Sequence, residues 1–316
     1  MSYANKVVRS IQVLNALVAL CLGACSTTPV EEEITELVVP TSGEAQYAVA
    51  TRADRIGRIV VPVSINGQGV FHLMLDTGAT HSVLTVAAAA RLGMNVTEAP
   101  ISVVQGVVGR VAAHVVMVDR LQAGSLKLQH LQMAVMDGVV VAELDGILGI
   151  GKLNNMILTA DFVKDRVNIR KSTGHRANAL DTVIKFDVVS NHLIVVDVMV
   201  GSVAVRAVID TGGSRTLGNL ELLKAITIQR DGQAGNQLGI TDVTENSKNG
   251  SALFLPSIQL GDIEIANSTI ICSDFDVFHS WHLERLPALL IGMDVLGQLG
   301  EVSIDYRRKE LRLTRR

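Results

Sequence analysis

The sequence is poor in aromatic residues, in cysteine and in clustered positive charge. Aromatic residues make up only 3% of the 316 residues, whereas apolar residues make up 48%. We therefore expect a core of Val, Ile, Leu and Ala, side chains that suit pleated, half-buried surfaces. The formal net charge is −3, and no run of Lys or Arg with interleaved aromatics is present, which argues against nucleic acid as a partner. The length allows two lobes of roughly 100–150 residues each.

The N-terminal residues have the pattern of a secretory signal. Lys6 and Arg9 precede the apolar run IQVLNALVALCLGAC, which is shorter than the ~20 residues that a membrane-spanning helix needs. Residues 22–25 resemble the lipobox of bacterial lipoproteins, in which the cysteine is lipidated and begins the mature chain. The resemblance implies a signal peptide at residues 1–24, lipidation of Cys25 and a lipid anchor in the cell envelope that faces the periplasm. Ser26 favours the outer membrane over the inner one; an ordinary signal or an uncleaved anchor is the alternative.

Cysteine is too scarce for a disulfide within the mature chain. Of the three cysteines, Cys21 leaves with the signal peptide and lipidation occupies Cys25, so that only Cys272 remains. Its alternating apolar context, STIICSDF, predicts a buried small apolar side chain rather than a nucleophile. Residues 25–50 carry the cysteine and a polar, acidic stretch, which predicts a tether with little packing of its own.

The chain contains an internal repeat. The segment FHLMLDTGATHSVL at residues 71–84 returns as VRAVIDTGGSRTL at residues 205–217. Asp76 and Asp210 hold the same place in the two copies, and 210 − 76 gives an offset of 134 residues. A single Asp-Thr-Gly triplet is often an ordinary turn. Two triplets at matched positions after matched apolar strands favour a shared function instead.

The similarity extends to both sides of the two triplets. Each copy has a strand, a glycine turn and a second strand before Asp-Thr-Gly, and a helical pattern after it, at residues 85–93 and 219–226. Each copy later has two apolar residues followed by a glycine, Gly149 or Gly292. We therefore predict a duplication, with an N-terminal lobe at 51–175 and a C-terminal lobe at 180–316.

Two carboxylates brought together about a pseudo-twofold axis cannot both ionise comfortably. They share a proton, so that one pKa rises and the other falls. The pair then supplies a general base and a general acid at the same pH. A water held between the two carboxyl groups is deprotonated for attack on a peptide carbonyl, while the other carboxyl protonates the developing oxyanion. Such chemistry needs no covalent intermediate, no metal and no cofactor.

These motifs resemble those of aspartic proteases of the retropepsin and pepsin clan, over about residues 50–316. LDTGAT is closer to the retroviral version, although both copies lie in one chain, as in pepsin. The resemblance implies an all-β, bilobal fold of two pseudo-twofold-related β-barrel lobes. It implies an aspartic endopeptidase with a catalytic dyad of Asp76 and Asp210. It also implies a monomer whose partner is a peptide or protein substrate, for which we expect other envelope proteins.

The resemblance gives several residues a supporting role. The two threonines are expected to hydrogen-bond across the axis, and the glycine after each threonine to allow close backbone approach. The two later glycines are expected to let interlocking strands of the ψ-loop type pack behind the catalytic loops. These residues are Thr77, Gly78, Thr211, Gly212, Gly149 and Gly292.

Each lobe has a region at the distance expected of a flap. In the first lobe, VVQGVVGRVAAHV contains Gly106 and Gly109 and resembles a glycine-rich retroviral flap, so we expect it to cover substrate. The second region, GNQLGITDVTENSKNGSALF, contains Gly239 and Gly250 but is long and polar. It is either a second flap or a plain loop. No Tyr occurs in either region, so the flap tyrosine of pepsins is absent.

Two other functions stay open from the sequence. The first is a peptide-binding envelope lipoprotein with weak catalysis, and retention of both Asp-Thr-Gly triplets argues against it. The second is a structural envelope protein, for which the sequence offers only the lipid anchor. His279 and His282 could share a helix face, but no third ligand is placed near them, so no metal site is predicted. We expect Asp145, Asp294 and Asp305 to be turn or structural hydrogen-bonding groups.

Overall fold

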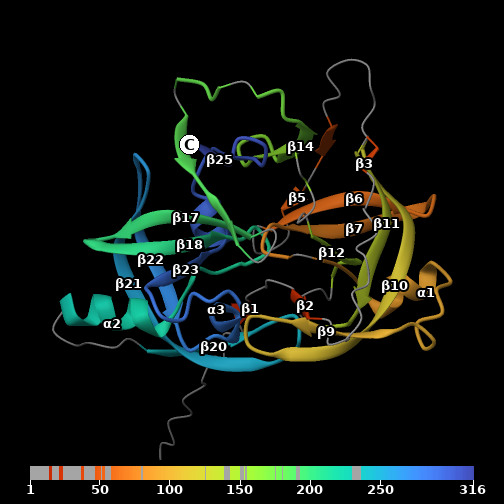
Figure 1. Cartoon of the computed structure of the whole chain (residues 1–316), viewed down its shortest axis with the longest axis horizontal. Coiled ribbons are helices and arrows are strands. Elements are labelled where there is room, and N and C mark those ends of the chain that lie inside the picture. The colour runs from red at the N-terminus through yellow and green to blue at the C-terminus, as the bar shows by residue number, and fades with distance from the viewer. Residues whose placement is uncertain are drawn as a thin grey trace, which may run out of the picture.

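The structure, a computed structural model, describes most of residues 58–316 and the backbone of five short strands that precede them (Figure 1). Within 58–316 the gaps are residues 80, 125, 139–142, 150–152, 154, 175, 180, 190–192 and 230–235. Cys25 lies outside the described residues, as do most of the predicted signal peptide and tether. No described helix is long and apolar enough to cross a membrane.

The N-terminal lobe is built on a ten-stranded sheet. Its order is β2-β9-β10-β11-β8-β12-β7-β6-β5, with β3 against β11. A second contact of β10, with β6, joins distant parts of the sheet and closes it into a barrel. The strands are β2 (Cys21–Gly23), β3 (Leu37–Val38), β5 (Arg52–Ala53), β6 (Ile59–Ile65), β7 (Gln68–Asp76), β8 (Ser82–Leu84), β9 (Ile101–Gln105), β10 (Arg110–Ala123), β11 (Leu126–Val135) and β12 (Gly146–Gly149).

The C-terminal lobe is built on a nine-stranded sheet. Its order is β1-β20-β21-β22-β19-β23-β18-β17-β16, and a second contact of β21, with β17, closes it in the same way. The strands are β1 (Leu14–Asn15), β16 (Asp187–Val189), β17 (Leu193–Val200), β18 (Val203–Ile209), β19 (Leu217–Gly218), β20 (Gln237–Thr241), β21 (Ser247–Leu260), β22 (Ile263–Cys272) and β23 (Ala288–Ile291).

The two lobes have one topology. From β9 to β5 and from β20 to β16, corresponding strands follow each other in the same order, and the closing contact falls between corresponding strands. In each lobe the strand that leads to Asp-Thr-Gly lies between a hairpin partner and a parallel strand, β6 and β12 around β7, β17 and β23 around β18. The all-β, bilobal fold predicted from the sequence is thus confirmed, and the repeat in the sequence is a repeat in space.

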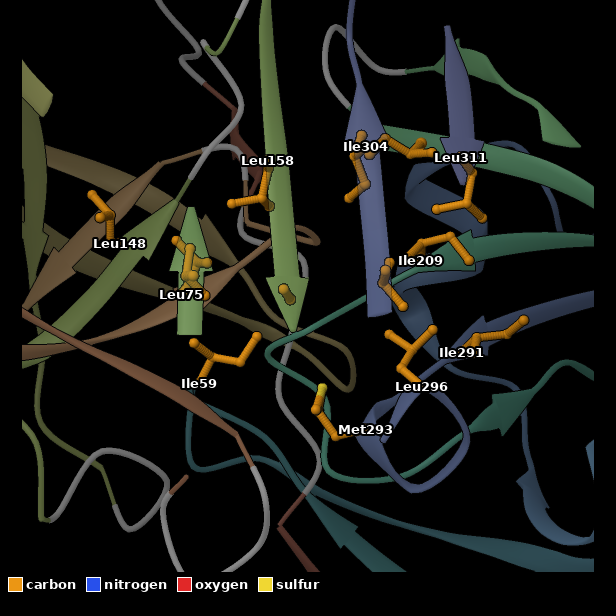
Figure 2. Close-up of a cluster of buried hydrophobic side chains, with 14 of the residues drawn as sticks. Ile59, Leu75, Leu148, Leu158, Ile209, Ile291, Met293, Leu296, Ile304 and Leu311 are labelled. Carbon is orange, nitrogen blue, oxygen red and sulfur yellow. The ribbon is translucent and has the colours of Figure 1, made fainter. Parts of the chain in front are cut away.

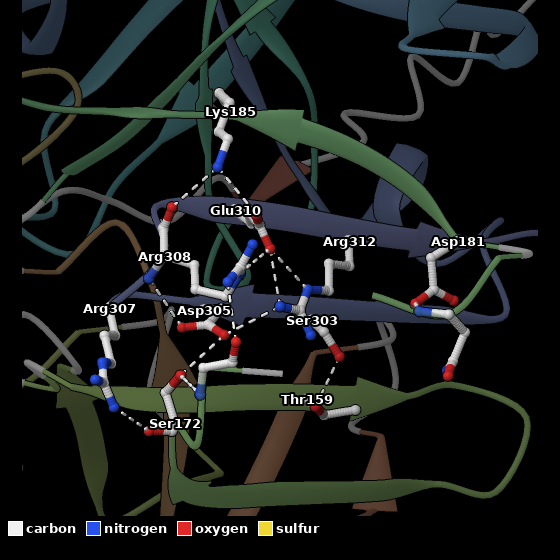
Figure 3. Close-up of polar contacts among 12 residues, drawn as sticks. Thr159, Ser172, Asp181, Lys185, Ser303, Asp305, Arg307, Arg308, Glu310 and Arg312 are labelled. Atoms are coloured by element: carbon white, nitrogen blue, oxygen red, sulfur yellow. Dashed lines mark hydrogen bonds and ion pairs between the residues drawn. The ribbon is translucent and has the colours of Figure 1, made fainter. Parts of the chain in front are cut away.

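A third, six-stranded sheet joins the lobes. Its order is β15-β25-β24-β13-β14-β4, and the pairing of β13 with β24 crosses from one lobe to the other. Polar side chains reinforce this junction (Figure 3): Ser172 Oγ donates to Asp305 Oδ2 over 3.0 Å, and Arg308 Nη1 donates to the carbonyl of Gly174 over 2.9 Å. The strands are β4 (Tyr47–Ala50), β13 (Met156–Asp161), β14 (Arg166–Lys171), β15 (Thr182–Lys185), β24 (Glu301–Asp305) and β25 (Glu310–Thr314).

The described helices are short, between four and ten residues long. Thr85 caps the first one by accepting from the N–H of Ala88, and Asn219 caps the second by accepting from the N–H of Leu222. These helices lie where the sequence predicted them, and their caps are 219 − 85 = 134 residues apart. The helices are α1 (Val86–Arg91), α2 (Leu220–Gln229), α3 (Asp276–Ser280) and α4 (Met293–Leu296).

The largest buried cluster passes beneath both Asp-Thr-Gly loops and continues into the six-stranded sheet (Figure 2). Leu75 and Ile209, the residues directly before Asp76 and Asp210, both belong to it and are fully buried. A fully buried Leu or Ile contributes on the order of 1.5–3 kcal/mol relative to the exposed side chain. The apolar residue before each aspartate therefore anchors the start of its loop in a core that the two lobes share.

Candidate active site

Each Asp-Thr-Gly loop begins where a central strand ends. Asp76 is the last residue of β7, and Gly149 of the parallel strand β12 lies opposite it in the pairing register. Asp210 follows β18, and its N–H donates to the carbonyl of Ile291 in β23 over 3.0 Å. Both aspartates are fully buried. The flanking strand thus fixes the backbone of each aspartate before the loop turns away.

The two loops are locked together by their threonines. The N–H of Thr77 donates to Thr211 Oγ1 over 3.1 Å, and the N–H of Thr211 donates to Thr77 Oγ1 over 3.0 Å. Each hydroxyl then donates to the opposite strand, Thr77 Oγ1 to the carbonyl of Ile209 over 2.7 Å and Thr211 Oγ1 to that of Leu75 over 2.9 Å. This reciprocal set of four bonds gives the loops their pseudo-twofold relation, so a shift of one loop must move the other.

The carboxylates face the junction of the two loops. Asp76 Oδ1 accepts from the N–H groups of Gly78 (2.7 Å) and Ala79 (2.9 Å), and Asp210 Oδ1 accepts from the N–H of Gly212 (2.8 Å). The Oδ2 atoms of both aspartates are buried and have no hydrogen-bond partner in the described part of the chain. Buried polar atoms without partners are rare and costly. Two of them in matched positions indicate a place where a water or a substrate atom binds.

Close approach of the loops explains the two glycines. A Cβ on Gly212 would lie 2.4 Å from Asp76 Cγ, and a Cβ on Gly78 would lie 2.9 Å from Asp210 Cγ. Real Cβ atoms do not come this close to other heavy atoms. Any side chain at these positions would therefore push the opposite carboxylate out of place.

Burial raises the pKa of both aspartates. For Asp76, burial is the largest cause, and the nearby charge of Asp210 raises its pKa further, well above the usual range. For Asp210, burial raises the pKa from 3.8 to about 6, while the neighbouring Asp76 carboxyl group and the backbone N–H groups of Gly212 and Gly213 lower it. The two carboxyl groups therefore titrate as a pair, and the pair keeps a proton at a pH where ordinary aspartates have lost theirs.

Gly149 and Gly292 lie behind the two loops. A Cβ on Gly149 would lie 2.7 Å from the carbonyl oxygen of His81, and a Cβ on Gly292 would lie 2.6 Å from that of Arg215. The N–H of Gly149 donates to Ser82 Oγ over 3.2 Å, and that of Gly292 donates to Thr216 Oγ1 over 3.1 Å. The structure thus brings both predicted glycines against the backbone of the segments that follow the Asp-Thr-Gly triplets.

Both flap regions are hairpins, and their tips meet between the lobes (Figure 1). Strands β9 and β10 form the first flap around residues 106–109, and β20 and β21 form the second around residues 242–246. The N–H of Val108 in the first tip donates to Asp242 Oδ2 in the second over 2.7 Å. The polar stretch with Gly239 and Gly250 is therefore a hairpin that meets the first one, rather than a plain loop.

Asp242 was not among the residues that the sequence analysis singled out. The strands β9 (101–105) and β20 (237–241) are 237 − 101 = 136 residues apart, so Asp242 corresponds in the repeat to Gly106, the first residue after β9, and not to Val108, the residue it contacts. An aspartate at that place, in a stretch otherwise read as a polar loop, gave no chemical reason to single it out. Asp242 matters because it binds the opposite flap, and the spacing of residues in the sequence does not show that the two flaps lie close together.

The remaining predicted residues have structural partners. Asp145 accepts from the N–H of His72 (2.7 Å), Asp294 from Thr216 Oγ1 (2.7 Å), and Asp305 takes part in the junction of the lobes. Cys272 is buried, as expected, and burial raises the pKa of its thiol to about 12. Among the described residues no group of three or more His, Cys, Asp and Glu side chains could hold a metal ion.

Comparison with known proteins agrees with this geometry. The profile of a family described as aspartyl protease matches the chain twice, at residues 61–152 and 196–295, which together are more than half of the chain. The crystal structure of the aspartic proteinase from Irpex lacteus superposes with a TM-score of 0.52 at 14% identity and covers 86% of this chain and 97% of that one. At this identity the likeness concerns the fold alone. No curated protein matches the sequence significantly. With one family match over each lobe, the chain belongs to the aspartyl protease family.

Proposed function

We propose that the protein is an aspartic endopeptidase that hydrolyses peptide bonds with a water activated by Asp76 and Asp210. The observation that carries this proposal is the pair of buried Oδ2 atoms without hydrogen-bond partners, one from each lobe. A structural protein or a simple peptide binder gains nothing from two such carboxyl groups in contact, since each costs free energy to bury.

The residues around the dyad fit the chemistry. With a single proton shared by the pair, one carboxylate takes a proton from the attacking water while the other carboxyl donates to the oxygen of the scissile carbonyl. The backbone N–H groups of Gly78 and Gly212 hold the two Oδ1 atoms, so the Oδ2 atoms remain for the water. The threonine lock keeps the pair in register during this proton transfer, which depends on sub-ångström placement.

The flap strands support a peptide in extended conformation as the substrate. The edges of β9 and β20 that face away from their hairpin partners each accept an extended backbone of this chain: β2 pairs antiparallel with β9, and β1 pairs parallel with β20. A strand edge that pairs with one extended segment has the donors and acceptors to pair with another. A substrate strand is therefore expected to bind along the flaps with its scissile bond at the dyad.

The side chains near the dyad favour apolar substrate residues. Met74, Ala79 and Val83 of the first loop region form one buried cluster with Val107 of the first flap and Val243 of the second. A substrate that replaces part of these contacts gains the most binding free energy when its side chains beside the scissile bond are aliphatic or aromatic. We expect cleavage between such residues rather than beside charged ones.

We also propose that Cys25 carries a lipid anchor in the cell envelope. The support is the sequence alone: the basic residues Lys6 and Arg9, the apolar run and the lipobox-like residues 22–25. Growth of the expressing bacterium with a radiolabelled fatty acid tests this. The protein should carry label and a Cys25→Ser variant should not; equal labelling of both would reject the anchor.

The proposed activity is tested with a statine-containing peptide, whose hydroxyl mimics the tetrahedral intermediate. The purified protein is incubated with a diverse peptide mixture from pH 4 to 8, with and without the statine peptide, and products are read by mass spectrometry. Internal cleavage that the statine peptide blocks would support an aspartic endopeptidase. Intact peptides from a folded protein would favour a binding protein with weak catalysis, and cleavage that the statine peptide leaves unchanged would point to a contaminating protease.

A further inference from the structure

The two flaps are held together by one buried carboxylate. Asp242 lies at the tip of the second flap and is fully buried. Its Oδ2 accepts from the N–H groups of Val108 (2.7 Å) and Gly109 (3.3 Å) in the first flap. Its Oδ1 accepts from the N–H (2.9 Å) and the hydroxyl (2.5 Å) of Thr244 in its own flap. The carboxylate thus has two donors from each flap, which offset part of the cost of burying its charge; burial still raises the pKa of Asp242.

The tip of the first flap is shaped for this carboxylate. A Cβ on Gly106 would lie 2.2 Å from Asp242 Oδ2, and a Cβ on Gly109 would lie 2.5 Å from Asn246 Nδ2. Neither glycine has a backbone conformation that only glycine favours. The glycines of the first flap are therefore needed for the close approach of the second flap and not for an unusual turn.

Each tip is also rigid within itself. In the first flap, Gln105 Nε2 donates to the carbonyl groups of Gly106 (2.7 Å) and Gly109 (3.0 Å), so it braces the turn from inside. In the second flap, Asn246 Nδ2 donates to Thr244 Oγ1 over 2.7 Å and so orients the hydroxyl that binds Asp242. Two rigid tips joined at one carboxylate separate as units, with the contacts of Asp242 as the point of release.

The closed flaps cover Asp76 and Asp210 and separate them from solvent. The carboxylates of Asp76 and Asp210 are fully buried, and Val107 and Val243 from the two tips lie in the same buried cluster as Met74 and Ala79 beside Asp76. The N–H of Val277 in α3 also donates to the carbonyl of Val107 over 3.1 Å, which holds the first tip against the C-terminal lobe. A peptide reaches the dyad only after the tips move apart.

We propose that Asp242 is a latch: its bonds to Val108 and Gly109 hold the two flaps closed, and their release is the step that admits an extended peptide to the cleft. The second half of this statement rests on the proposed peptidase function, and the first half does not. Asp242 is a positioning residue, since it acts on the flap and touches neither the dyad nor the reacting atoms. The latch is asymmetric, because one lobe supplies a carboxylate where the other supplies backbone N–H groups.

The first test measures the latch without any substrate. Hydrogen exchange of the amides at residues 106–109 is followed in the full chain, in Asp242→Ala and in Asp262→Asn. Asp262 is an exposed carboxylate in the turn after β21, at the other end of that strand, and serves as the control. Loss of two charge-assisted bonds should speed exchange of Val108 and Gly109 by roughly tenfold or more, with no change in the control. Equal exchange in wild type and a folded Asp242→Ala protein would overturn the latch.

A second variant guards against a folding defect of the first. Gly106→Ala leaves Asp242 intact but places a methyl group against its Oδ2, so it should speed exchange of the same amides. In the Asp242→Ala background the same methyl should have a smaller effect, because the carboxyl atoms at 2.2 and 2.8 Å are gone and only Thr244 Cγ2, at 2.9 Å, remains close to it. Independent, additive effects of the two substitutions would show that the glycine and the carboxylate do not act as one contact, and would reject the proposal.

The second test measures access to the cleft. The probe is the statine-containing peptide, and its association and dissociation rate constants are measured by surface plasmon resonance. Release of a latch raises the fraction of molecules with open flaps, so Asp242→Ala should raise the association rate constant by roughly tenfold and should not weaken Kd. A residue that only stabilises the fold would weaken Kd without faster association, and that result would overturn the gating role. If the probe fails to bind wild type, the peptidase proposal fails, while the exchange result still decides the latch.

Discussion

Substitution of Asp210 by Asn should stabilise the protein at neutral pH and leave it almost unchanged in acid. Burial raises the pKa of Asp210 from 3.8 to about 6 in the folded protein, whereas the unfolded chain has a pKa near the ordinary value. Between these two pKa values the folded state binds more protons than the unfolded state. The free energy of unfolding therefore falls as the pH rises from about 4 to about 6.

The size of the effect follows from the shift. A difference of about two pKa units corresponds to roughly 3 kcal/mol of unfolding free energy, and the wild-type protein has lost this amount in full above pH 6. Asn keeps the shape of the side chain and an oxygen that can accept from the N–H of Gly212, but it has no charge to bury. Asp210→Asn should therefore gain up to about 3 kcal/mol of unfolding free energy at pH 8 and close to nothing at pH 4.

Denaturant unfolding at pH 4, 6 and 8 checks this prediction, with Asp262→Asn as the matched control on an exposed carboxylate. The wild-type curve should lose stability between pH 4 and 6 relative to Asp210→Asn, and the control should follow the wild type throughout. A variant that is no more stable than wild type at pH 8 would refute the reasoning, because the carboxylate would then carry no burial penalty.

Three further substitutions test the framework around the dyad. Thr77→Val should lower the free energy of unfolding by about 2–4 kcal/mol, because it leaves buried backbone groups of the other loop unpaired. Thr77→Ser keeps the hydroxyl and should lose much less in thermal or denaturant unfolding, and an equal loss in both variants would reject the threonine lock. Gly212→Ala should lower kcat/KM by about 100-fold or more through displacement of Asp76, whereas Gly239→Ala, whose Cβ has ordinary room, should stay near wild type in the same peptide assay. Glu310→Gln should lower the melting temperature at pH 7 but not near pH 2, because hydrogen bonds, chiefly from Arg308, hold the pKa of the Glu310 carboxyl at about 2. The stabilisation by Glu310 is therefore present above pH 4.5 and is lost as the pH falls. A loss of melting temperature that does not depend on pH would contradict this explanation.

Most of the correct predictions from the sequence rested on its internal repeat. The two Asp-Thr-Gly triplets, their apolar strands and the later glycines lie at matched spacing, so the duplicated lobes and the pairing of Asp76 with Asp210 could be expected before any coordinates. Helix caps followed the same rule, with Thr85 and Asn219 in equivalent places. These features are local in the chain or repeated along it, and sequence patterns report such features directly.

Contacts between the lobes could not be predicted in the same way. The junction of β13 with β24 depends on how two complete barrels pack, and the latch at Asp242 depends on two hairpins that are separated by more than 130 residues. A polar stretch such as residues 241–249 is read as a loop because polar side chains are usually solvated. A buried carboxylate is held there by N–H groups of the opposite flap together with the N–H and hydroxyl of Thr244 in its own flap.

Peptide cleavage by the two single-aspartate variants tests the central claim most directly. A peptide that the wild type cleaves is incubated under single-turnover conditions with wild type, Asp76→Asn, Asp210→Asn and the exposed control Asp262→Asn. If each lobe supplies one carboxyl group to one dyad, either aspartate variant should lose about 1000-fold or more in rate, while the control keeps full activity. Substantial cleavage by a folded Asp76→Asn or Asp210→Asn protein would contradict the shared site between the lobes.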